Sequence, residues 1–517
     1  MSNITRRLAV GLLCLGGITA RAESPRPGAA DEAATLNYQK ANMHLCPQGK
    51  WALGEDTWGK IVRVNMLKIT PADWAQVPGV KKAWPMRGFE GVEGMAFHPI
   101  LSEVKDVDGD GKLDIFRCRS EHPGARIERL RYDDGSVVWE SEPVGALFGD
   151  ETRLPVFDLH GSGGFSVLYA SRHDDCGKLC CFDAETGEPQ WCASYGDGEI
   201  KNHGNGQGDV VVGHFFDRRT QAVVVRDGGI LRCYDHTGEI QWTHDTNLRG
   251  GADYAHEIMC SDVDGDGLDE IFANWQKLTM GLRGDGTVLW EDRTQRHHSD
   301  FVDCGDVDGD GKIEVIYDHE GCGAAKGPIY VADPLTGNIK AKVDYRQQGV
   351  GHAQNIALGD FDKTSKGLEI AFCEKGRNIY LFDAAGKLVW KRPVPASLLS
   401  KGDWDGDGDE EILAFGLGAN VDGMFSVWDG DGTRLYAISF LPSPYNRFPE
   451  STQDPRYKKN LGGSWRAHAM PGGHEGVRRQ IDLDGNGRAD VIMPFGEWHW
   501  GSSSILFLME GRPKSDN

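Results

Sequence analysis

The chain has 517 residues, enough for several domains or for one large repeat architecture. Its formal net charge is −22, which argues against binding to nucleic acid. After the first residues, no segment is long and apolar enough to span a bilayer, so we expect no membrane partner either.

The start of the chain has the features of an export signal. Arg6 and Arg7 precede an apolar stretch, and Ala20-Arg21-Ala22 has the small-residue pattern of a cleavage site. We therefore predict a signal peptide over residues 1–22 and a secreted or periplasmic protein, with a twin-arginine route also permitted by the Arg pair. Residues 23–50 are predicted to form a poorly structured leader.

Twelve cysteines are present, and Cys14 lies in the predicted signal. Export permits disulfides, but the odd remainder leaves at least one thiol unpaired within the chain. A cluster in one region is expected to include a bridge: Cys176, Cys180, Cys181 and Cys192.

An acidic loop recurs five times along the chain, with oxygen-bearing side chains at positions 1, 3, 5 and 9 and glycines at positions 4 and 6. Such a loop can wrap oxygens around a hard cation, so we predict structural calcium sites. Position 12 lacks the Glu of an EF-hand, and the flanks read as strands. A plain Asp/Gly hairpin turn is disfavoured because position 9 is acidic in all five copies. The predicted ligands are Asp106, Asp108, Asp110 and Asp114; Asp262, Asp264, Asp266 and Glu270; Asp306, Asp308, Asp310 and Glu314; Asp403, Asp405, Asp407 and Glu411; and Asp482, Asp484, Asn486 and Asp490.

The loops belong to a longer repeat. After each loop and strand comes an apolar run, then Asp, a turn with Gly, and another apolar run that often ends in Trp. The loops at Asp262 and Asp306 start 44 residues apart, and degenerate copies lie near Asp158, Asp217 and Asp360. This repeat predicts an all-β fold over residues 51–517, an eight-bladed β-propeller with seven blades as the alternative count. A linear β-solenoid is less favoured. We expect residues 61–67 to supply the strand that closes the ring.

A second pattern appears when the copies are aligned on the first Asp of the loop. His298 lies eight residues before that Asp, and His256 and Asp300 lie six residues before it. Because strand side chains alternate, these positions share one face near the start of the innermost strands. The next strand returns to the same mouth of the central channel and ends near Glu320. His256, His298, Asp300 and Glu320 are therefore predicted to form a metal site, although each one alone could be a rim residue with local hydrogen bonds.

The repeat is interrupted by an insertion at about residues 437–475, which is basic and aromatic in an otherwise acidic protein. We interpret it as a substrate-binding loop, with cationic side chains for carboxylates and aromatic rings for sugar faces; a solvated surface loop is the alternative. The predicted substrate-binding residues are Trp465, His468, Tyr457 and Arg447.

With these features, the chain resembles the rhamnogalacturonan lyases of polysaccharide lyase family 11. The resemblance rests on the acidic-loop repeat, with His256 before one DVDGDG loop, His298-Ser299-Asp300 before the next, and Glu320 after it. It implies a secreted eight-bladed propeller whose active-site calcium is held by those four side chains. The chain is shorter than typical members, and the N-terminal domain expected before the propeller is largely missing. We therefore expect a divergent relative, whose substrate could be another uronate polymer.

The resemblance implies metal-assisted β-elimination on an anionic polysaccharide. A cation neutralises the C6 carboxylate of a uronate, a base removes the C5 proton, and the group at C4 leaves. His352 is the first candidate for the base, and Lys458, Lys459, Arg466 and His468 are others. Tyr254 could donate a proton or line the pocket, and His319 is interpreted as structural. Two His ligands would suit zinc or manganese equally well, so calcium at this site rests on the resemblance.

Two other classes remain open. A calcium-stabilised adhesion or carbohydrate-binding propeller explains the acidic loops but not the converging ligands. A quinoprotein dehydrogenase would explain the Trp repeats and the adjacent Cys180 and Cys181, but not the acidic loops. The protein is expected to be a monomer.

Overall fold

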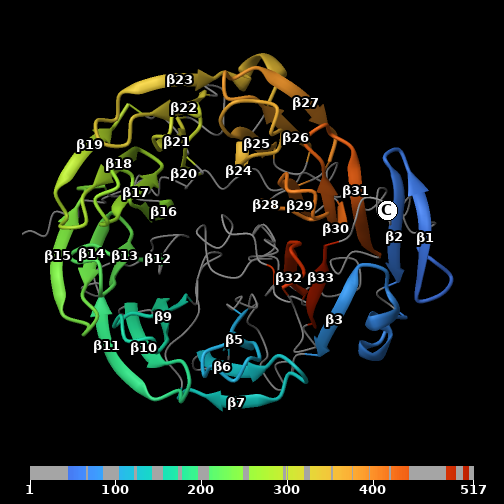
Figure 1. The fold of residues 1–517 in the computed structure, drawn as a ribbon, viewed down its shortest axis with the longest axis horizontal. Coiled ribbons are helices and arrows are strands. Elements are labelled where there is room, and N and C mark those ends of the chain that lie inside the picture. Colours follow the sequence, from blue (N-terminus) through green and yellow to red (C-terminus); the bar gives the residue numbers. More distant parts are fainter. Residues whose placement is uncertain are drawn as a thin grey trace, which may run out of the picture.

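The computed structural model is a ring of small β-sheets around a central axis (Figure 1). Among the described residues the only helices are two short 3₁₀ turns, η1 (Pro71–Gln76) and η2 (Tyr345–Gln348). The structure describes residues 45–65, 68–85, 104–120, 125–142, 155–172, 177–195, 209–248, 255–294, 299, 301–319, 327–350, 353–374, 377–394, 396, 398–418, 421–441, 482, 485–495 and 505–511.

Six sheets follow one another along the chain, each starting at its innermost strand and ending at the rim (Figure 1). The first three consist of β4 (Val104–Lys105), β5 (Asp114–Ser120), β6 (Ala125–Arg131) and β7 (Val137–Glu140); β8 (Val156–Phe157), β9 (Ser166–Arg172), β10 (Gly177–Asp183) and β11 (Pro189–Tyr195); and β12 (Asp209–Gly213), β13 (Ala222–Asp227), β14 (Ile230–Tyr234) and β15 (Ile240–Asp245). The next three consist of β16 (Ala255–Ser261), β17 (Glu270–Trp275), β18 (Leu278–Leu282) and β19 (Val288–Asp292); β20 (Val302–Gly305), β21 (Glu314–Asp318), β22 (Ile329–Ala332) and β23 (Ile339–Val343); and β24 (Ala353–Gly359), β25 (Glu369–Glu374), β26 (Asn378–Phe382) and β27 (Leu388–Arg392).

Two further sheets complete the ring and combine both ends of the chain. One contains β28 (Leu398–Gly402), β29 (Glu411–Gly418), β30 (Val421–Trp428) and β31 (Arg434–Leu441), extended at the rim by β2 (Gly59–Asn65) and β1 (Trp51–Asp56). The other has β32 (Asp490–Phe495), β33 (Ile505–Glu510) and β3 (Val80–Pro85) as its described strands. The β-propeller prediction is confirmed. Seven sheets have four or more strands and so count as full blades, which is the number given above as the alternative to eight. The sheet with three described strands lies between two of these blades.

The ring is closed by a different N-terminal segment from the one expected. β3 pairs antiparallel with β33, from Val80↔Met509 to Pro85↔Ile505. β2 instead pairs in parallel with β31 of the preceding sheet, with Val62 opposite Ile438. The prediction that residues 61–67 close the ring is therefore wrong: that strand covers the outer edge of a sheet that already has four strands of its own.

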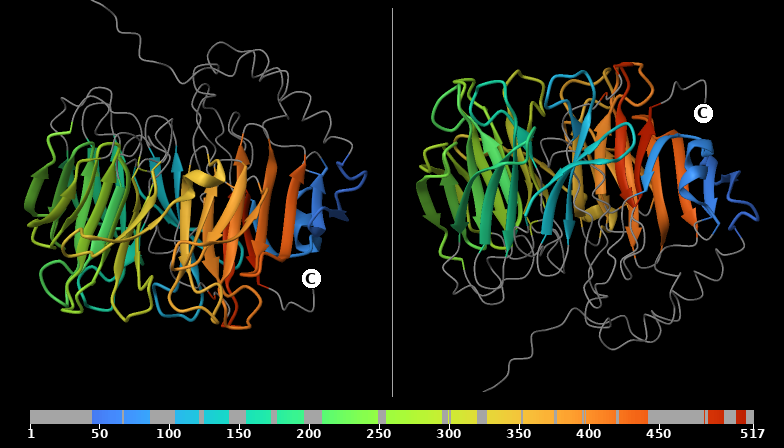
Figure 2. Two further views of the ribbon diagram at one scale, coloured as in Figure 1. Left: turned by 90° about the horizontal axis from the view of Figure 1, so that it is seen from above. Right: turned by 90° about the horizontal axis from the view of Figure 1, so that it is seen from below.

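The second strand of each sheet lies in the core. Every residue of β13, β17, β21 and β25 is buried, because the sheets on both sides pack against these strands. This burial on two faces explains their continuous apolar runs, in contrast to the alternating exposure of rim strands such as β19. The strands run across the thickness of the disc (Figure 2).

The tryptophans at the rim join each sheet to the next. Trp191 on β11 donates its Nε1–H to the carbonyl of His236 in the β14–β15 turn, at 3.1 Å. Trp242 and Trp290 make the same contact with Gly284 and Pro334 of the sheets that follow them. The Trp repeats of the sequence therefore serve packing between blades, which removes the main support for a quinoprotein.

The turn that contacts each of these tryptophans contains a glycine, and the missing side chain leaves room for the indole ring. Gly238 has a φ of +84°, and a Cβ there would lie 2.7 Å from Cδ2 of Trp191. Gly163 has a similar φ of +87° but no atom within 4 Å of the same position, so it is a matched control. We expect Gly163→Ala to lower the free energy of unfolding by about 1 kcal/mol through backbone strain, and Gly238→Ala by about 1–3 kcal/mol more through overpacking. Urea unfolding measures both; equal losses would show that the tryptophan contact tolerates a methyl group.

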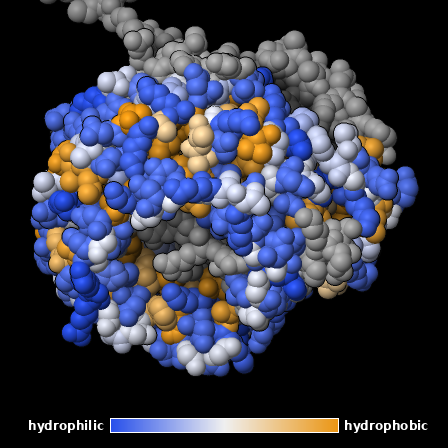
Figure 3. All heavy atoms as spheres, turned by 45° about the horizontal axis from the view of Figure 1, so that its top comes forward, coloured by the Kyte–Doolittle hydropathy of each residue, from blue (hydrophilic) through white to orange (hydrophobic). Residues whose placement is uncertain are grey.

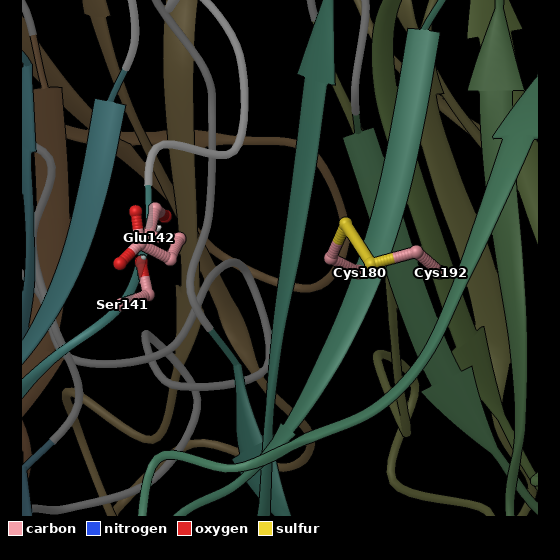
Figure 4. The surroundings of a disulfide bond; sticks show 4 residues. All are labelled: Ser141, Glu142, Cys180 and Cys192. Carbon is pink, nitrogen blue, oxygen red and sulfur yellow. Dashed lines mark hydrogen bonds between the residues drawn. A yellow bond between two sulfur atoms is a disulfide. The ribbon is translucent and has the colours of Figure 1, made fainter.

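The cysteine cluster contains a bridge, as predicted. Cys180 on β10 and Cys192 on β11 are direct partners in the antiparallel register and form a disulfide, with Cα atoms 4.2 Å apart (Figure 4). The next residue, Cys181, points to the other face of the strand and is buried.

The surface of the described residues is mainly hydrophilic on the face shown in Figure 3. Exposed large apolar side chains such as Leu53, Ile240 and Val389 belong to the outermost strands of different sheets. Within the described ranges, no helix is long and apolar enough to cross a membrane. Residues 1–22 and most of 23–50 lie outside these ranges, and so do residues 442–475 of the predicted insertion, whereas its residues 437–441 belong to β31. The signal, the leader, the insertion and the monomeric state stay predictions.

Candidate active site and cation-binding loops

The acidic loops lie between the first and second strands, and the first Asp of each loop shapes it. In the loop after β16, Asp262 accepts hydrogen bonds from the N–H groups of Gly265 and Gly267 at 2.8 and 2.9 Å. Both glycines have positive φ, +75° and +86°. Glycine is favoured at positions 4 and 6 because this left-handed backbone is strained for other residues. The loops at Asp106 and Asp403 make the same pair of bonds.

Neighbouring loops bond to each other around one face of the ring. The N–H of Asp269 donates to the carbonyl of His214 at 2.9 Å, and the N–H of Ala489 donates to that of Asp403 at 2.7 Å. The degenerate loop at Asp360 takes part in the same series of loop–loop contacts, because the N–H of Glu410 donates to the carbonyl of Asp360 at 3.0 Å. These acidic loops therefore also form contacts between neighbouring sheets.

Four loops gather carboxylates in a form that suits a metal ion. Ligand oxygens within 4.8 Å of one another come from Asp106, Asp108 and Asp110; Asp262, Asp264 and Glu270; Asp306, Asp308 and Glu314; and Asp403, Asp405 and Glu411. The late carboxylates Glu270, Glu314 and Glu411 are the first residues of β17, β21 and β29, and they are buried. Asp306 has a buried Oδ1 without a hydrogen-bond partner. Such oxygen-only clusters fit a hard cation.

The other predicted loop residues have local roles in the described structure. The side chains at position 5 accept the N–H two residues later, at 2.8 to 2.9 Å; they are Asp110, Asp266, Asp310, Asp407 and Asn486. In the last loop Asp482 accepts the N–H of Gly487 at 2.7 Å, and Asp490 is buried at the start of β32. Asp484 lies outside the described residues.

Burial makes these clusters costly when no cation compensates them. Burial, with a further contribution from Asp264, raises the pKa of Glu270 to about 7. Burial and the nearby Asp405 raise the pKa of Glu411 to about 9. Both groups would be held ionised by a bound cation, which removes the reason for the raised pKa.

Basic side chains compensate the loops unequally. Arg129 lies 2.5 Å from Asp108 and 2.6 Å from Asp114, so the late carboxylate of that loop is paired with a guanidinium instead of joining the cluster. Lys340 lies 2.5 Å from Glu314. In the loop at Asp262, Arg283 is more distant, 3.4 Å from Glu270. Of these three loops, the one at Asp106 therefore has the most of its negative charge paired with a basic side chain.

The predicted active site belongs to the opposite end of the strands. The β16–β17 pair runs from Ser261↔Glu270 beside an acidic loop to Ala255↔Trp275 at the other end. β20 and β21 run in the same sense, from Gly305↔Glu314 to Val302↔Tyr317. The start of β16, the residues before β20 and the end of β21 therefore lie at one end of two adjacent sheets.

The side chains of the predicted ligands lie outside the described residues. His256 is described only through its backbone, at a register shift between Ala255 and Glu257. The remaining ligands His298, Asp300 and Glu320 are outside altogether, as are Tyr254, His352, Lys459, Arg466, Trp465, His468, Tyr457 and Arg447. His319 contacts Thr294 through Nε2 at 2.7 Å and packs against Tyr330, which agrees with its structural interpretation.

A set of buried polar residues at this end of the ring was not predicted from the sequence. They are at most 1% exposed, and hydrogen bonds connect them across three sheets: Arg226, Glu257, Asn274, Ser299 and Asp318. We call this set the buried polar chain. The available signal was a charged or amide residue late in an apolar strand, as in VVVRD and EIFANW.

The family relationship follows from the sequence over the same sheets. The model of the C-terminal domain of rhamnogalacturonan lyase family 11 matches residues 178–471. The chain belongs to this family. Those residues span the sheets from β10 to β31, including the acidic loops at Asp262, Asp306 and Asp403 and all four predicted ligands.

Two relatives from Bacillus subtilis are only distantly similar to this chain. The rhamnogalacturonan exolyase YesX of Bacillus subtilis is 27% identical over 392 residues, 71% of this chain and 57% of the relative. The rhamnogalacturonan endolyase YesW of the same organism is 24% identical over 429 residues, 71% of this chain and 64% of the relative. The chain thus spans less than two thirds of the length of these relatives. The crystal structure of YesW matches with a TM-score of 0.54 over 83% of this chain and 76% of its own, at 19% identity, which supports the propeller fold.

Proposed function

We propose that this chain is a secreted polysaccharide lyase that cleaves a uronate-containing, rhamnogalacturonan-like polymer by metal-assisted β-elimination. The observation that carries the proposal is the family match over residues 178–471, which contain the whole predicted ligand set. The strand topology supports it, because the described neighbours of those ligands lie at one end of two adjacent sheets. Membership of the family favours the lyase over a non-catalytic adhesion propeller.

In this proposal His256, His298, Asp300 and Glu320 hold a divalent cation. Calcium is the ion that the family resemblance implies, and zinc or manganese would also suit two histidines. The cation would neutralise the uronate carboxylate and so acidify the neighbouring proton. His352 is the first candidate for the base that removes this proton, and the basic, aromatic insertion would bind the polymer. The acidic loops would bind calcium on the opposite face, in a structural role.

The test is the appearance of an unsaturated uronate. Purified protein is mixed with rhamnogalacturonan, and separately with polygalacturonate, with calcium and after chelation, and the ultraviolet absorbance of the new C4–C5 double bond is followed. We expect product from at least one polymer and a loss on the order of 1,000-fold in His298→Ala, because a catalytic metal supplies several kcal/mol to the transition state.

His160→Ala is the matched control for this assay. His160 is a histidine beside the degenerate loop at Asp158, on the face of the acidic loops, and it contacts Gln190 at 3.3 Å. Its substitution is expected to leave the rate unchanged. Calcium-dependent binding of polymer without any unsaturated product would instead favour the adhesion function.

A further inference from the structure

The residues of the buried polar chain occupy one repeated position. Arg226, Asn274 and Asp318 are each the fifth residue of the second strand of a sheet, in β13, β17 and β21. In the next two sheets the same position holds Cys373 and Phe415, both buried and apolar in character. Polar side chains at this position are thus found in three consecutive sheets, two of which carry the predicted ligands.

Asn274 and Asp318 have the same role in their two sheets. Oδ1 of Asn274 accepts the N–H of Glu257 at 2.7 Å, and Oδ1 of Asp318 accepts the N–H of Phe301 at 3.1 Å. Each of these N–H groups belongs to the residue directly after a predicted ligand, His256 in one sheet and Asp300 in the other. Both side chains therefore fix the backbone immediately beside a ligand position.

Ser299 couples the two sheets and lies between the predicted ligands His298 and Asp300 in the sequence. Its hydroxyl accepts from Nδ2 of Asn274 at 3.0 Å and donates to Asp318, whose Oδ1 lies 2.9 Å away and whose carbonyl lies 2.7 Å away. Ser299 is fully buried. A hydroxyl that both accepts and donates in this way sets the relative position of the two strands.

The remaining two members of the buried polar chain, Glu257 and Arg226, form hydrogen bonds to the backbone of neighbouring strands. Oε2 of Glu257 accepts the N–H of Val302 at 2.9 Å, which joins β16 to β20. Nη1 of Arg226 donates to the carbonyls of Glu257 and Asn274 at 2.6 and 2.9 Å. The link through Glu257 is a general device of this fold, because Asn355 makes the equivalent bond to the N–H of Leu399 at 2.8 Å. The bonds through Asn274, Ser299 and Asp318 are the part specific to the predicted site.

We propose that Asn274, Ser299 and Asp318 are positioning residues, which hold the segments around His256 and Asp300 in the geometry that binds the cation. This inference rests on the proposed function. Apolar residues fill the same position in neighbouring sheets, so packing alone does not require this buried polar set. Second-shell hydrogen bonds of this kind orient metal ligands, and their loss commonly weakens metal binding 10- to 100-fold.

The experiment measures metal binding without relying on activity. The full chain is loaded with Mn²⁺, and electron-spin-echo spectroscopy detects nitrogen coupling from histidine ligands. The acidic loops offer oxygen ligands, so nitrogen coupling reports on the histidine-containing site alone. We expect Ser299→Ala to weaken Mn²⁺ binding at the nitrogen-coordinated site about 10-fold or more. Asp318→Asn keeps an acceptor oxygen for Phe301 and Ser299 and is expected to bind Mn²⁺ much as the wild type does.

Ser426→Ala is the matched control. Ser426 on β30 is also fully buried, and its hydroxyl accepts a hydrogen bond from Nε1 of Trp428 at 2.9 Å, in a sheet outside the buried polar chain. Both alanine variants are expected to lower Tm, but only Ser299→Ala should weaken Mn²⁺ binding. Ser299→Cys, with a weaker donor of similar size, replaces it if the alanine variant does not fold.

The possible failures are distinguishable. Wild-type Mn²⁺ affinity in Ser299→Ala, together with a normal nitrogen signal, would overturn the positioning role and leave the proposed cation site intact. A wild-type protein without nitrogen coupling would overturn the cation site and this inference with it. Lyase activity of that same protein would then require a different catalytic arrangement.

Discussion

Chelation of bound cations is expected to lower the Tm of this protein, and by more at about pH 8 than at about pH 5. Without a cation the pKa of Glu411 is about 9 in the folded state, against about 4.3 in an unfolded chain. A carboxyl group with a raised folded pKa binds its proton more tightly in the folded state, so the cation-free fold loses stability as pH rises between these two values. Each pKa unit corresponds to about 1.4 kcal/mol, so Glu411 alone would cost roughly 3 kcal/mol between pH 5 and neutrality.

Glu270, whose pKa is about 7, should act in the same direction up to neutral pH. Bound calcium holds these groups ionised and offsets the cost, so its stabilising effect should grow with pH. Differential scanning calorimetry with calcium and with a chelator, at both pH values, measures the difference. Glu411→Gln keeps an oxygen for the N–H of Trp404 and should flatten the pH dependence of the chelated protein. Equal Tm values with calcium and chelator would show that the loops are plain turns.

Removal of β33 is expected to abolish cooperative unfolding of the ring. β33 is the central strand of its sheet, between β3 and β32, so its loss leaves both of them without their described partner. This loss also separates the N-terminal segment from the last blade. A chain that ends at residue 504 should lose at least about 5 kcal/mol, comparable to the whole stability of a typical domain.

A chain that ends at Gly511 is the control for this truncation. It keeps β33 and the carbonyl of Gly511, which accepts the Nε–H of Arg488 at 2.9 Å. Its calorimetric transition should match that of the full chain. If the chain ending at residue 504 melted with the same Tm and cooperativity, closure by β3 and β33 would not be needed for stability.

Local pattern was enough to predict the propeller but not how its ends meet. The acidic loops and the apolar runs after them are properties of a few consecutive residues, and they placed β17, β21 and β29 correctly. The closing strand is a pairing between residues 80–85 and 505–510, far apart in the sequence. Residues 61–67 also form an apolar strand, with Ile61, Val62 and Val64 buried. Strand propensity could not decide which of the two segments pairs with the last blade.

The position of the predicted site along the strands also rests on local geometry. Registration on the acidic loops identified the end of the strands at which His256 and Asp300 are expected, because alternation and antiparallel return are fixed by backbone geometry. It did not reveal Asn274 or Asp318, because the aligned pattern lies before the acidic loops, whereas these two residues lie inside the apolar strands after them and act as hydrogen-bond partners. Their partners come from other strands and sheets, so the contacts appear only in three dimensions.

The disulfide between Cys180 and Cys192 is protected against exchange with three buried free thiols of the same chain. Exchange requires a thiolate, and burial raises the pKa of the adjacent Cys181 to about 12. Burial likewise raises the pKa of Cys233 and Cys304 well above its usual range. These three thiols stay protonated and shielded in the folded protein, so none of the three presents a nucleophile that could scramble the native bond.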